Sequence, residues 1–148
     1  MWQFEHQEII DAPVEVVFKL ISDLPNYPNW NPFLIIARGK VEMGGVISGK
    51  SVLGKHTTSY RHKIFEYIPN KSLCWHDFGF ISKFVYSQRS RYTESRDGKT
   101  YYKCHLRISG LLSGLVNIIF GEGLRNGIVA EAKATKKEAE KISQKNER

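Results

Sequence analysis

The residues that most often carry chemistry in proteins form no familiar catalytic motif in this chain. The five histidines, at positions 6, 56, 62, 76 and 105, include no pair with the H-x-x-x-H spacing that holds a metal ion on a helix. No nucleophile elbow, phosphate-binding loop or dinucleotide fingerprint occurs. His62 and Glu66 share one face of a predicted strand, but at about 13 Å apart they are too far for a direct pair. The sequence therefore predicts no metal, no cofactor and no assigned catalytic residue.

The two cysteines, Cys74 and Cys104, lack the C-x-x-C spacing of redox or zinc sites. We place them on strands separated by one other strand, which puts them roughly 9–10 Å apart. A disulfide needs a Cα separation below roughly 7 Å. We expect two free thiols.

The elements that position any site begin with a strand over 2–10, where the even positions from Phe4 to Ile10 alternate with Gln3, Glu5 and Gln7. Asp11 is a candidate N-cap, and Pro13 suits the first turn of a helix. This helix continues with an apolar stripe at three- and four-residue spacing, made of Val14, Val17, Phe18 and Ile21. Prolines at 25, 28 and 32 end the helix and limit the next segment to a short helical turn or loop.

Beyond this region the sequence alternates as strands do, with Gly, Pro and Asn turn signals between the segments. After Gly110 the pattern becomes helical, from about 111 to 141. This order of elements is packed most simply as an antiparallel sheet with all helices on one face. The sequence therefore predicts an α+β domain. The predicted strands cover residues 33–41, 45–53, 57–68, 72–79, 84–95 and 99–109.

The last hairpin decides which side chains point inward. We interpret the even positions of both 84–95 and 99–109 as buried, and directly opposed residues share a face. A two-residue Asp97-Gly98 turn would pair odd with even positions and place the arginines of 84–95 inside. A three-residue loop, Arg96-Asp97-Gly98 with Gly98 left-handed, pairs even with even. We therefore predict the three-residue loop.

This register gives an inner face that mixes aromatic side chains with isolated polar groups. Such a mixture is typical of a ligand pocket, which is mainly apolar with a few placed polar groups. The alternative is a filled core in which Gln88 and Ser90 bond each other or ordered water. The predicted inner residues are Tyr60, His62, Ile64, Trp75, Tyr86, Gln88, Ser90, Tyr92, Tyr102, Cys104 and Leu106.

The closing helix is apolar nearly all round in its first half and is then interrupted by Gly121, Gly123 and Gly127. Each glycine costs roughly 1 kcal/mol relative to alanine within a helix. This weak, apolar segment is compatible with a movable lid over the pocket and equally with close packing of the glycines against the sheet or a partner subunit. The lid residues predicted to contact a ligand are Leu112, Leu115 and Ile119.

Length and charge limit the class of protein. The 148 residues are most simply one domain, with a charged helix end and tail over 131–148, and the net charge is +7. The N-terminus lacks a signal-peptide pattern, and the apolar stretch 111–120 is about half a membrane span, so we expect a soluble, cytosolic protein.

The predicted register also gives a basic outer sheet face. The default interpretation of such a face is a solvated surface, and the alternative is transient contact with an anionic membrane or an acidic partner. Nucleic acid is disfavoured because exposed aromatic side chains do not interleave with these charges. The basic residues are Arg61, Lys63, Arg89, Arg91, Lys103 and Arg107.

The segment IDAPVEVVFKLISDLPNYPNWNPF, residues 10–33, resembles the opening of the START/polyketide-cyclase-like (SRPBCC) superfamily. The matching pattern is I-x-A-P-x-x-V-[WF] followed by D-x-x-x-Y-P-x-W-N-P-F. The later strands and the long helix fit the same order, so the resemblance covers the whole chain. It implies the helix-grip fold of the birch pollen allergen, in which a curved antiparallel sheet of about seven strands surrounds a long C-terminal helix, with two short helices after the first strand.

The resemblance also implies a function. Members bind lipids, sterols or polyketides in a cavity, and some cyclise or dehydrate polyketides. Trp30 and Phe33 would then lie near the cavity mouth, although Trp30 could equally plug the fold. We expect a monomer or weak dimer that binds or transports a small hydrophobic ligand, with a polyketide cyclase or dehydratase as the alternative. A basic-faced module that binds membranes or proteins is a second alternative.

Overall fold

The computed structural model describes all 148 residues and has the predicted order of one strand, two short helices, six strands and a long helix. One short helical turn, η2, was not predicted, and the long helix ends five residues later than the predicted residue 141. The elements are β1 (Trp2–Ile10), α1 (Val14–Ser22), η1 (Leu24–Asn29), β2 (Leu34–Gly39), β3 (Val46–Leu53), β4 (His56–Ile68), β5 (Ser72–Asp77), η2 (Phe80–Lys83), β6 (Tyr86–Arg96), β7 (Lys99–Ser109) and α2 (Ser113–Asn146).

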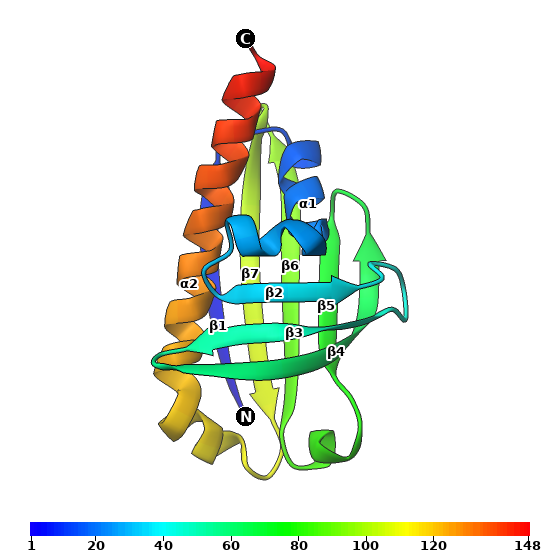
Figure 1. The fold of residues 1–148 in the computed structure, drawn as a ribbon, viewed down its shortest axis with the longest axis vertical. Coiled ribbons are helices and arrows are strands. Elements are labelled where there is room, and N and C mark those ends of the chain that lie inside the picture. Colours follow the sequence, from blue (N-terminus) through cyan, green and yellow to red (C-terminus); the bar gives the residue numbers. More distant parts are fainter.

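The seven strands form one antiparallel sheet in the order β1-β7-β6-β5-β4-β3-β2. In Figure 1, β2, β3 and β4 cross the upright strands β5, β6 and β7 at a steep angle, so the sheet is strongly curved. Helix α2 runs along one side of the molecule, and α1 and η1 cover the upper part of the sheet (Figure 1). This arrangement is the predicted helix-grip fold. None of its helices has the length and apolar character needed to cross a membrane.

The α1–η1 region is fixed by prolines and by one buried tyrosine. The N-cap of α1 is Pro13, whose carbonyl accepts hydrogen bonds from the amides of Val16 and Val17, and no side chain caps the helix. The predicted Asp11 cap is therefore wrong. Within η1, Tyr27 is fully buried and its hydroxyl donates to the carbonyl of Ile21 at the end of α1. This bond joins α1 to η1.

The β6–β7 hairpin corrects the predicted register. Its turn has two residues, Asp97 and Gly98, with φ values of 53° and 79°, and Arg96 pairs with Lys99. Positive φ at both central residues is the type I′ geometry that Asp-Gly favours, because its twist matches that of the strands. The predicted three-residue loop is wrong, and the odd positions of β6 share a face with the even positions of β7.

The corrected register turns the arginines of β6 inward. Arg89 is opposite Leu106 and Arg91 is opposite Cys104, and the two arginines keep only 7% and 0% of their surface exposed. They therefore do not belong to a basic outer face. Burial of two cations is costly without a counter-charge, and the fold supplies a buried carboxylate for them that cannot be recognised from the strand alone.

Helix α2 packs closely where its glycines lie. A Cβ atom on Gly127 would lie 2.3 Å from Cδ1 of the Phe33 ring, and one on Gly123 would lie 3.2 Å from the backbone nitrogen of Gly54. These contacts support the close-packing interpretation of Gly127 and Gly123. By contrast, Gly114 has open space around it. Cys74 and Cys104 are buried and unbridged, as predicted.

Candidate functional site

A cavity of about 200 Å³ lies between the concave face of the sheet and α2. Side chains from six strands, from α2 and from the segments that precede β2 and β6 line it, and most of them are apolar. The lining residues are Phe33, Leu34, Ser51, Tyr60, His62, Trp75, Asp77, Val85, Ser87, Arg89, Leu106, Ile108, Leu124 and Ile128. An apolar wall with a few polar groups is the usual composition of a small-molecule site.

One polar group in this wall is a histidine–aspartate pair. Nδ1 of His62 lies 2.8 Å from Oδ1 of Asp77, because β4 and β5 place these residues directly opposite each other. The second carboxylate oxygen, Oδ2, accepts hydrogen bonds from the Ser87 amide at 2.9 Å and the Ser87 hydroxyl at 2.7 Å. The His62 ring is stacked between Tyr60 and Trp75, with centroids 5.2 Å and 6.3 Å away. The imidazole therefore lies between two aromatic rings with Nδ1 beside the Asp77 carboxylate.

The carboxyl of Asp77 is held in its charged form. Burial acts to raise its pKa, but the hydrogen bonds from His62 and Ser87 outweigh burial and lower the pKa below its usual value. An ionised Asp77 beside Nδ1 favours the tautomer with the proton on Nδ1, which makes Nε2 the basic nitrogen of His62. This arrangement can accept a proton from a bound molecule.

A second polar cluster, which we call the arginine–glutamate cluster, lies beside the cavity and consists of Arg89, Arg91, Glu131 and Asn31. Arg89 Nη2 donates to Glu131 Oε1, and Arg91 Nη1 lies 3.6 Å from the same oxygen. Asn31 Nδ2 donates to Glu131 Oε2 at 2.8 Å. The carboxylate is completely buried on α2. The cluster thus ties the sheet, the η1–β2 connection and α2 together.

The same cluster gives a structural role to Asn31, which belongs to the motif of residues 10–33. Oδ1 of Asn31 accepts the amides of Phe33 and Leu34 at 3.0 and 2.9 Å, which shapes the chain as it enters β2. Burial acts to raise the pKa of Glu131, but the Arg89 and Arg91 guanidinium groups outweigh it and keep that pKa below its usual value. Glu131 therefore remains a buried anion.

Aromatic rings cover the two guanidinium groups. The Arg89 guanidinium carbon lies 5.4 Å from the centre of the Phe33 ring, and that of Arg91 lies 4.2 Å from the Trp75 ring. Cation–π contacts of this kind stabilise a cation that has lost its water. Phe33 and Trp75 thus contact both the cavity and the arginine–glutamate cluster.

The structure brings together only part of the predicted site. Five predicted residues line the cavity: Phe33, Tyr60, His62, Trp75 and Leu106. Tyr102 and Cys104 are buried on the same sheet face but do not line the cavity, and Trp30 packs against Tyr27 with ring centroids 5.3 Å apart. Whether any of these residues binds a ligand stays a prediction.

The remaining predicted residues lie elsewhere. The corrected register places four of them on the sheet face opposite the cavity: Tyr86, Gln88, Ser90 and Tyr92. Three others, Leu112, Leu115 and Ile119, are exposed on the first turns of α2, at 41%, 52% and 60%. They do not line the cavity.

Sequence reasoning missed Asp77, Ser87, Arg89 and Glu131. The Asp97-Gly98 pair was the available signal for the inward arginines, since it favours a two-residue hairpin. For Glu131 the signal was helical spacing, because it follows the buried Ile128 by three residues. The partner of His62 was sought on its own strand, whereas cross-strand neighbours are the closer ones.

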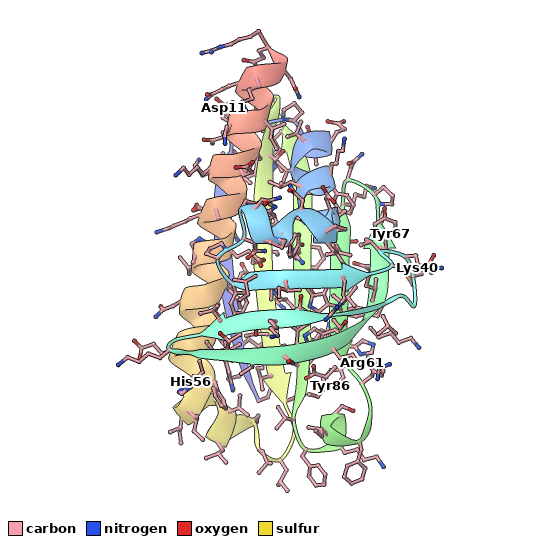
Figure 2. The ribbon with its side chains drawn as sticks, in the orientation of Figure 1. Asp11, Lys40, His56, Arg61, Tyr67 and Tyr86 are labelled. Carbon is pink, nitrogen blue, oxygen red and sulfur yellow. The ribbon has the colours of Figure 1, made fainter.

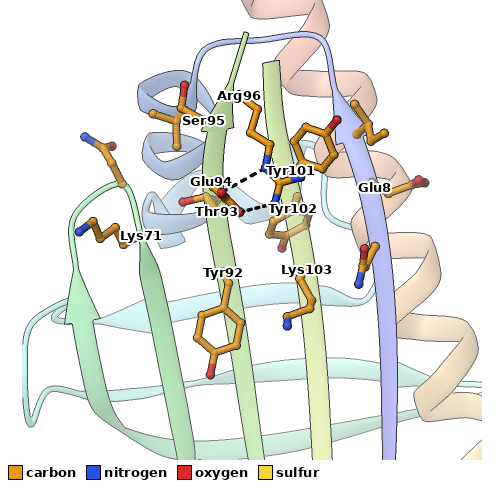
Figure 3. Close-up of a pocket in the computed structure, with 14 residues that line it drawn as sticks. Glu8, Lys71, Tyr92, Thr93, Glu94, Ser95, Arg96, Tyr101, Tyr102 and Lys103 are labelled. Carbon is orange, nitrogen blue, oxygen red and sulfur yellow. Dashed lines mark hydrogen bonds and ion pairs between the residues drawn. The ribbon is translucent and has the colours of Figure 1, made fainter. Parts of the chain in front are cut away.

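The outer sheet face carries a wider hollow of about 1020 Å³ over β1, β6 and β7. Figure 3 shows Tyr92 and Lys103 side by side there, and Arg96 bonded to Glu94 on the same strand. The Lys103 ammonium lies 5.6 Å from the centre of the Tyr92 ring. Only five of the 14 residues that line this hollow are hydrophobic, against nine of 14 in the inner cavity, so the inner cavity is the stronger candidate for an apolar ligand. No group of three or more His, Cys, Asp or Glu side chains in the protein is placed to hold a metal ion.

A curved antiparallel sheet closed by a long C-terminal helix, with a cavity between them, defines a helix-grip domain of the SRPBCC superfamily. Residues 1–140 match the model of the family described as polyketide cyclase/dehydrase and lipid transport, and the chain belongs to this family. No curated protein sequence matches it significantly.

Several solved structures share the fold. The Zhui aromatase/cyclase from a Streptomyces species is 13% identical, with a TM-score of 0.75 over 94% of this chain and 93% of that one. A Thermus thermophilus protein is 12% identical, with a TM-score of 0.77 over 96% and 99%. Norcoclaurine synthase from Thalictrum flavum, solved with dopamine and hydroxybenzaldehyde, is 14% identical, with a TM-score of 0.67 over 92% and 84%. At these identities the likeness establishes the fold alone.

Proposed function

We propose that the protein binds a small hydrophobic molecule in the cavity between the sheet and α2. The observation that supports this function is the mainly apolar wall of the cavity, interrupted by His62, Tyr60 and Arg89. Family membership fits the same function, because the family description covers lipid transport as well as cyclisation.

The size of the cavity restricts the ligand. A volume of about 200 Å³ is below the roughly 300–1,000 Å³ of sites for drug-sized molecules. A one- or two-ring compound or a short acyl chain is the matching size. A longer lipid or polyketide exceeds this volume.

A cavity-filling variant tests this function. Leu124→Trp adds an indole to the α2 wall of the cavity, whereas Ala130→Trp adds the same group to an exposed position on the same helix. With 2-naphthol as the probe, titration calorimetry is expected to give one site in the wild type and in Ala130→Trp, and none in Leu124→Trp. Absence of binding to the wild type, or equal binding to both variants, contradicts the proposal.

A second candidate function is proton transfer on a bound ketone, as in polyketide cyclisation or dehydration. The observation that favours it is the His62–Asp77 pair, in which Ser87 holds the far side of the carboxylate. His62 Nε2 would take a proton from the carbon next to the carbonyl, leaving an enolate on the ligand and an imidazolium beside Asp77. General bases of this kind contribute roughly 10²–10⁴-fold to a rate.

Hydrogen–deuterium exchange tests this second function without knowledge of the natural substrate. The wild type is expected to accelerate exchange at the α-carbon of 2-tetralone in heavy water, followed by NMR. Asp77→Asn is expected to slow that exchange by about 100-fold while 2-naphthol binding is retained. Equal rates for both proteins, or for wild type and buffer, would leave ligand binding as the only supported function.

A further inference from the structure

One end of the protein exposes a cluster of large apolar side chains, which we call the apolar tip. Its members come from η2 with its following residue and from the start of α2. Their exposed fractions lie between 41% and 84%, with Leu111 and Ile118 the most exposed. The apolar tip consists of Phe80, Ile81, Phe84, Leu111, Leu112, Leu115, Ile118 and Ile119. A contiguous exposed apolar patch on a folded domain usually marks an interaction surface.

The two segments form one surface. The amide of Leu112 donates to the carbonyl of Phe84 at 3.0 Å, so the chain leading into α2 is held directly against the end of η2. The rings of Phe80 and Phe84 lie 5.7 Å apart in an edge-to-face contact. Figure 1 places η2 and the start of α2 at the same lower end of the molecule, and Figure 2 shows side chains projecting outward from that end.

The charges within the apolar tip have one sign, and the exposed Glu122, one helical turn beyond Ile118, is the first acidic residue along α2. Residues 78–93 and 98–121 contain no aspartate or glutamate. Lys83 lies within the tip, with its ammonium 5.5 Å from the centre of the Phe80 ring, and Arg107 is exposed on the adjoining strand. Apolar side chains flanked by cations match the chemistry of an anionic membrane surface, where the side chains enter the acyl boundary and the cations meet headgroups.

We propose that the apolar tip docks on the surface of a bilayer that contains anionic lipid. A second copy of this chain is the less suitable occupant. A two-fold pairing through the tip would bring Lys83 and Arg107 close to their own copies. No carboxylate within the two tip segments compensates them, and the first acidic residue along α2 is Glu122, at the border of the tip. Anionic headgroups provide that compensation.

The apolar tip is continuous with the wall of the cavity. Val85 directly follows Phe84 and lines the cavity, and Leu124 lines it about one and a half helical turns beyond Ile119. A ligand that leaves a bilayer at the tip would therefore meet the end of the protein nearest these two residues. This route rests on the proposed ligand-binding function, but the docking itself does not.

Vesicle sedimentation tests the docking. The wild type is expected to sediment with vesicles of phosphatidylcholine and phosphatidylglycerol, and more weakly with phosphatidylcholine alone. Ile118→Asp and Ile81→Asp, at side chains 83% and 75% exposed, are each expected to reduce partitioning about 10-fold, which is 1.4 kcal/mol. The matched control is Met43→Asp, at a side chain 62% exposed on a different part of the surface, and it is expected to bind as the wild type does.

Two results would overturn the proposal, and a third measurement shows whether the variants fold. Equal partitioning of Ile118→Asp, Ile81→Asp and Met43→Asp would show that the tip does not contact lipid. A wild-type dimer that dissociates in Ile118→Asp, without vesicle binding, would make the tip a self-association surface. Retained 2-naphthol binding in the tip variants would show that they fold and that their loss of vesicle binding is separate from the cavity.

Discussion

Replacing Glu131 with glutamine is the sharpest test of the structure. Glutamine keeps the size of the side chain, and its carbonyl oxygen can still accept the hydrogen bond from Asn31. The substitution removes the only carboxylate in contact with Arg89 and Arg91, both of which are buried. The two guanidinium groups then share the interior without a counter-charge.

The expected cost is large. Removal of one partner from a buried ion pair costs about 3–5 kcal/mol, because the remaining charge stays desolvated and uncompensated. A domain of this size has roughly 5–15 kcal/mol of stability in total. At about 2–4 °C per kcal/mol, the melting temperature is expected to fall by roughly 6–20 °C.

Urea denaturation and thermal unfolding, both followed by circular dichroism, measure this cost. The matched control is Glu122→Gln, at an exposed glutamate on the same helix, which is expected to change stability by less than about 0.5 kcal/mol. A triple variant, Arg89→Met/Arg91→Met/Glu131→Leu, is expected to recover most of the loss, since apolar replacement of a whole buried cluster is often neutral. A Glu131→Gln protein as stable as Glu122→Gln would refute the buried cluster, and so would a triple variant no more stable than the single one.

Three further predictions concern pH and glycines. The folded pKa of Glu131 is lowered, so its contribution is complete above the unfolded pKa of about 4.3 and is lost as the pH falls through the lower folded value. Wild-type stability in urea is therefore expected to decline below about pH 4.3, and Glu131→Gln is expected to decline less steeply, because one titrating group is absent. Gly127→Ala is expected to lower the free energy of unfolding by about 1–3 kcal/mol, because its Cβ would lie 2.3 Å from the Phe33 ring. The matched control is Gly114→Ala, in open space on the same helix, which is expected to raise the free energy of unfolding by up to about 1 kcal/mol. Equal shifts of the two variants in urea would contradict the close helix–ring contact. Gly98→Ala is expected to cost about 1–2 kcal/mol, since φ is +79° there, and an unchanged urea midpoint would argue against the type I′ turn.

Much of the fold could be predicted from local patterns. Alternation over 2–10 and 99–109 marks β1 and β7 to the residue, and the prolines after α1 mark where that helix cannot continue. These signals are local, since period two and proline geometry act within a few residues. The curved sheet closed by α2 followed from the resemblance of the opening motif to the SRPBCC superfamily.

The site was harder to predict because its groups meet across the chain. Arg89 and Glu131 are 42 residues apart in sequence, and the carboxylate that makes an inward arginine acceptable lies on the last helix. Without that partner, burial of Arg89 would cost too much free energy, so the sequence alone favours the wrong register. His62 was recognised as a cavity residue, but its partner Asp77 lies on the neighbouring strand.

The two-residue turn at Asp97–Gly98 has a consequence for how this chain can change over evolution. Because successive side chains of a strand face opposite sides, one inserted or deleted residue in the turn would shift the pairing and exchange the two faces of one strand. A shift in β6 would carry Arg89 and Arg91 to the solvent side and leave Glu131 buried alone. Homologues that keep the arginine–glutamate cluster should therefore vary the length of this turn only in steps of two residues.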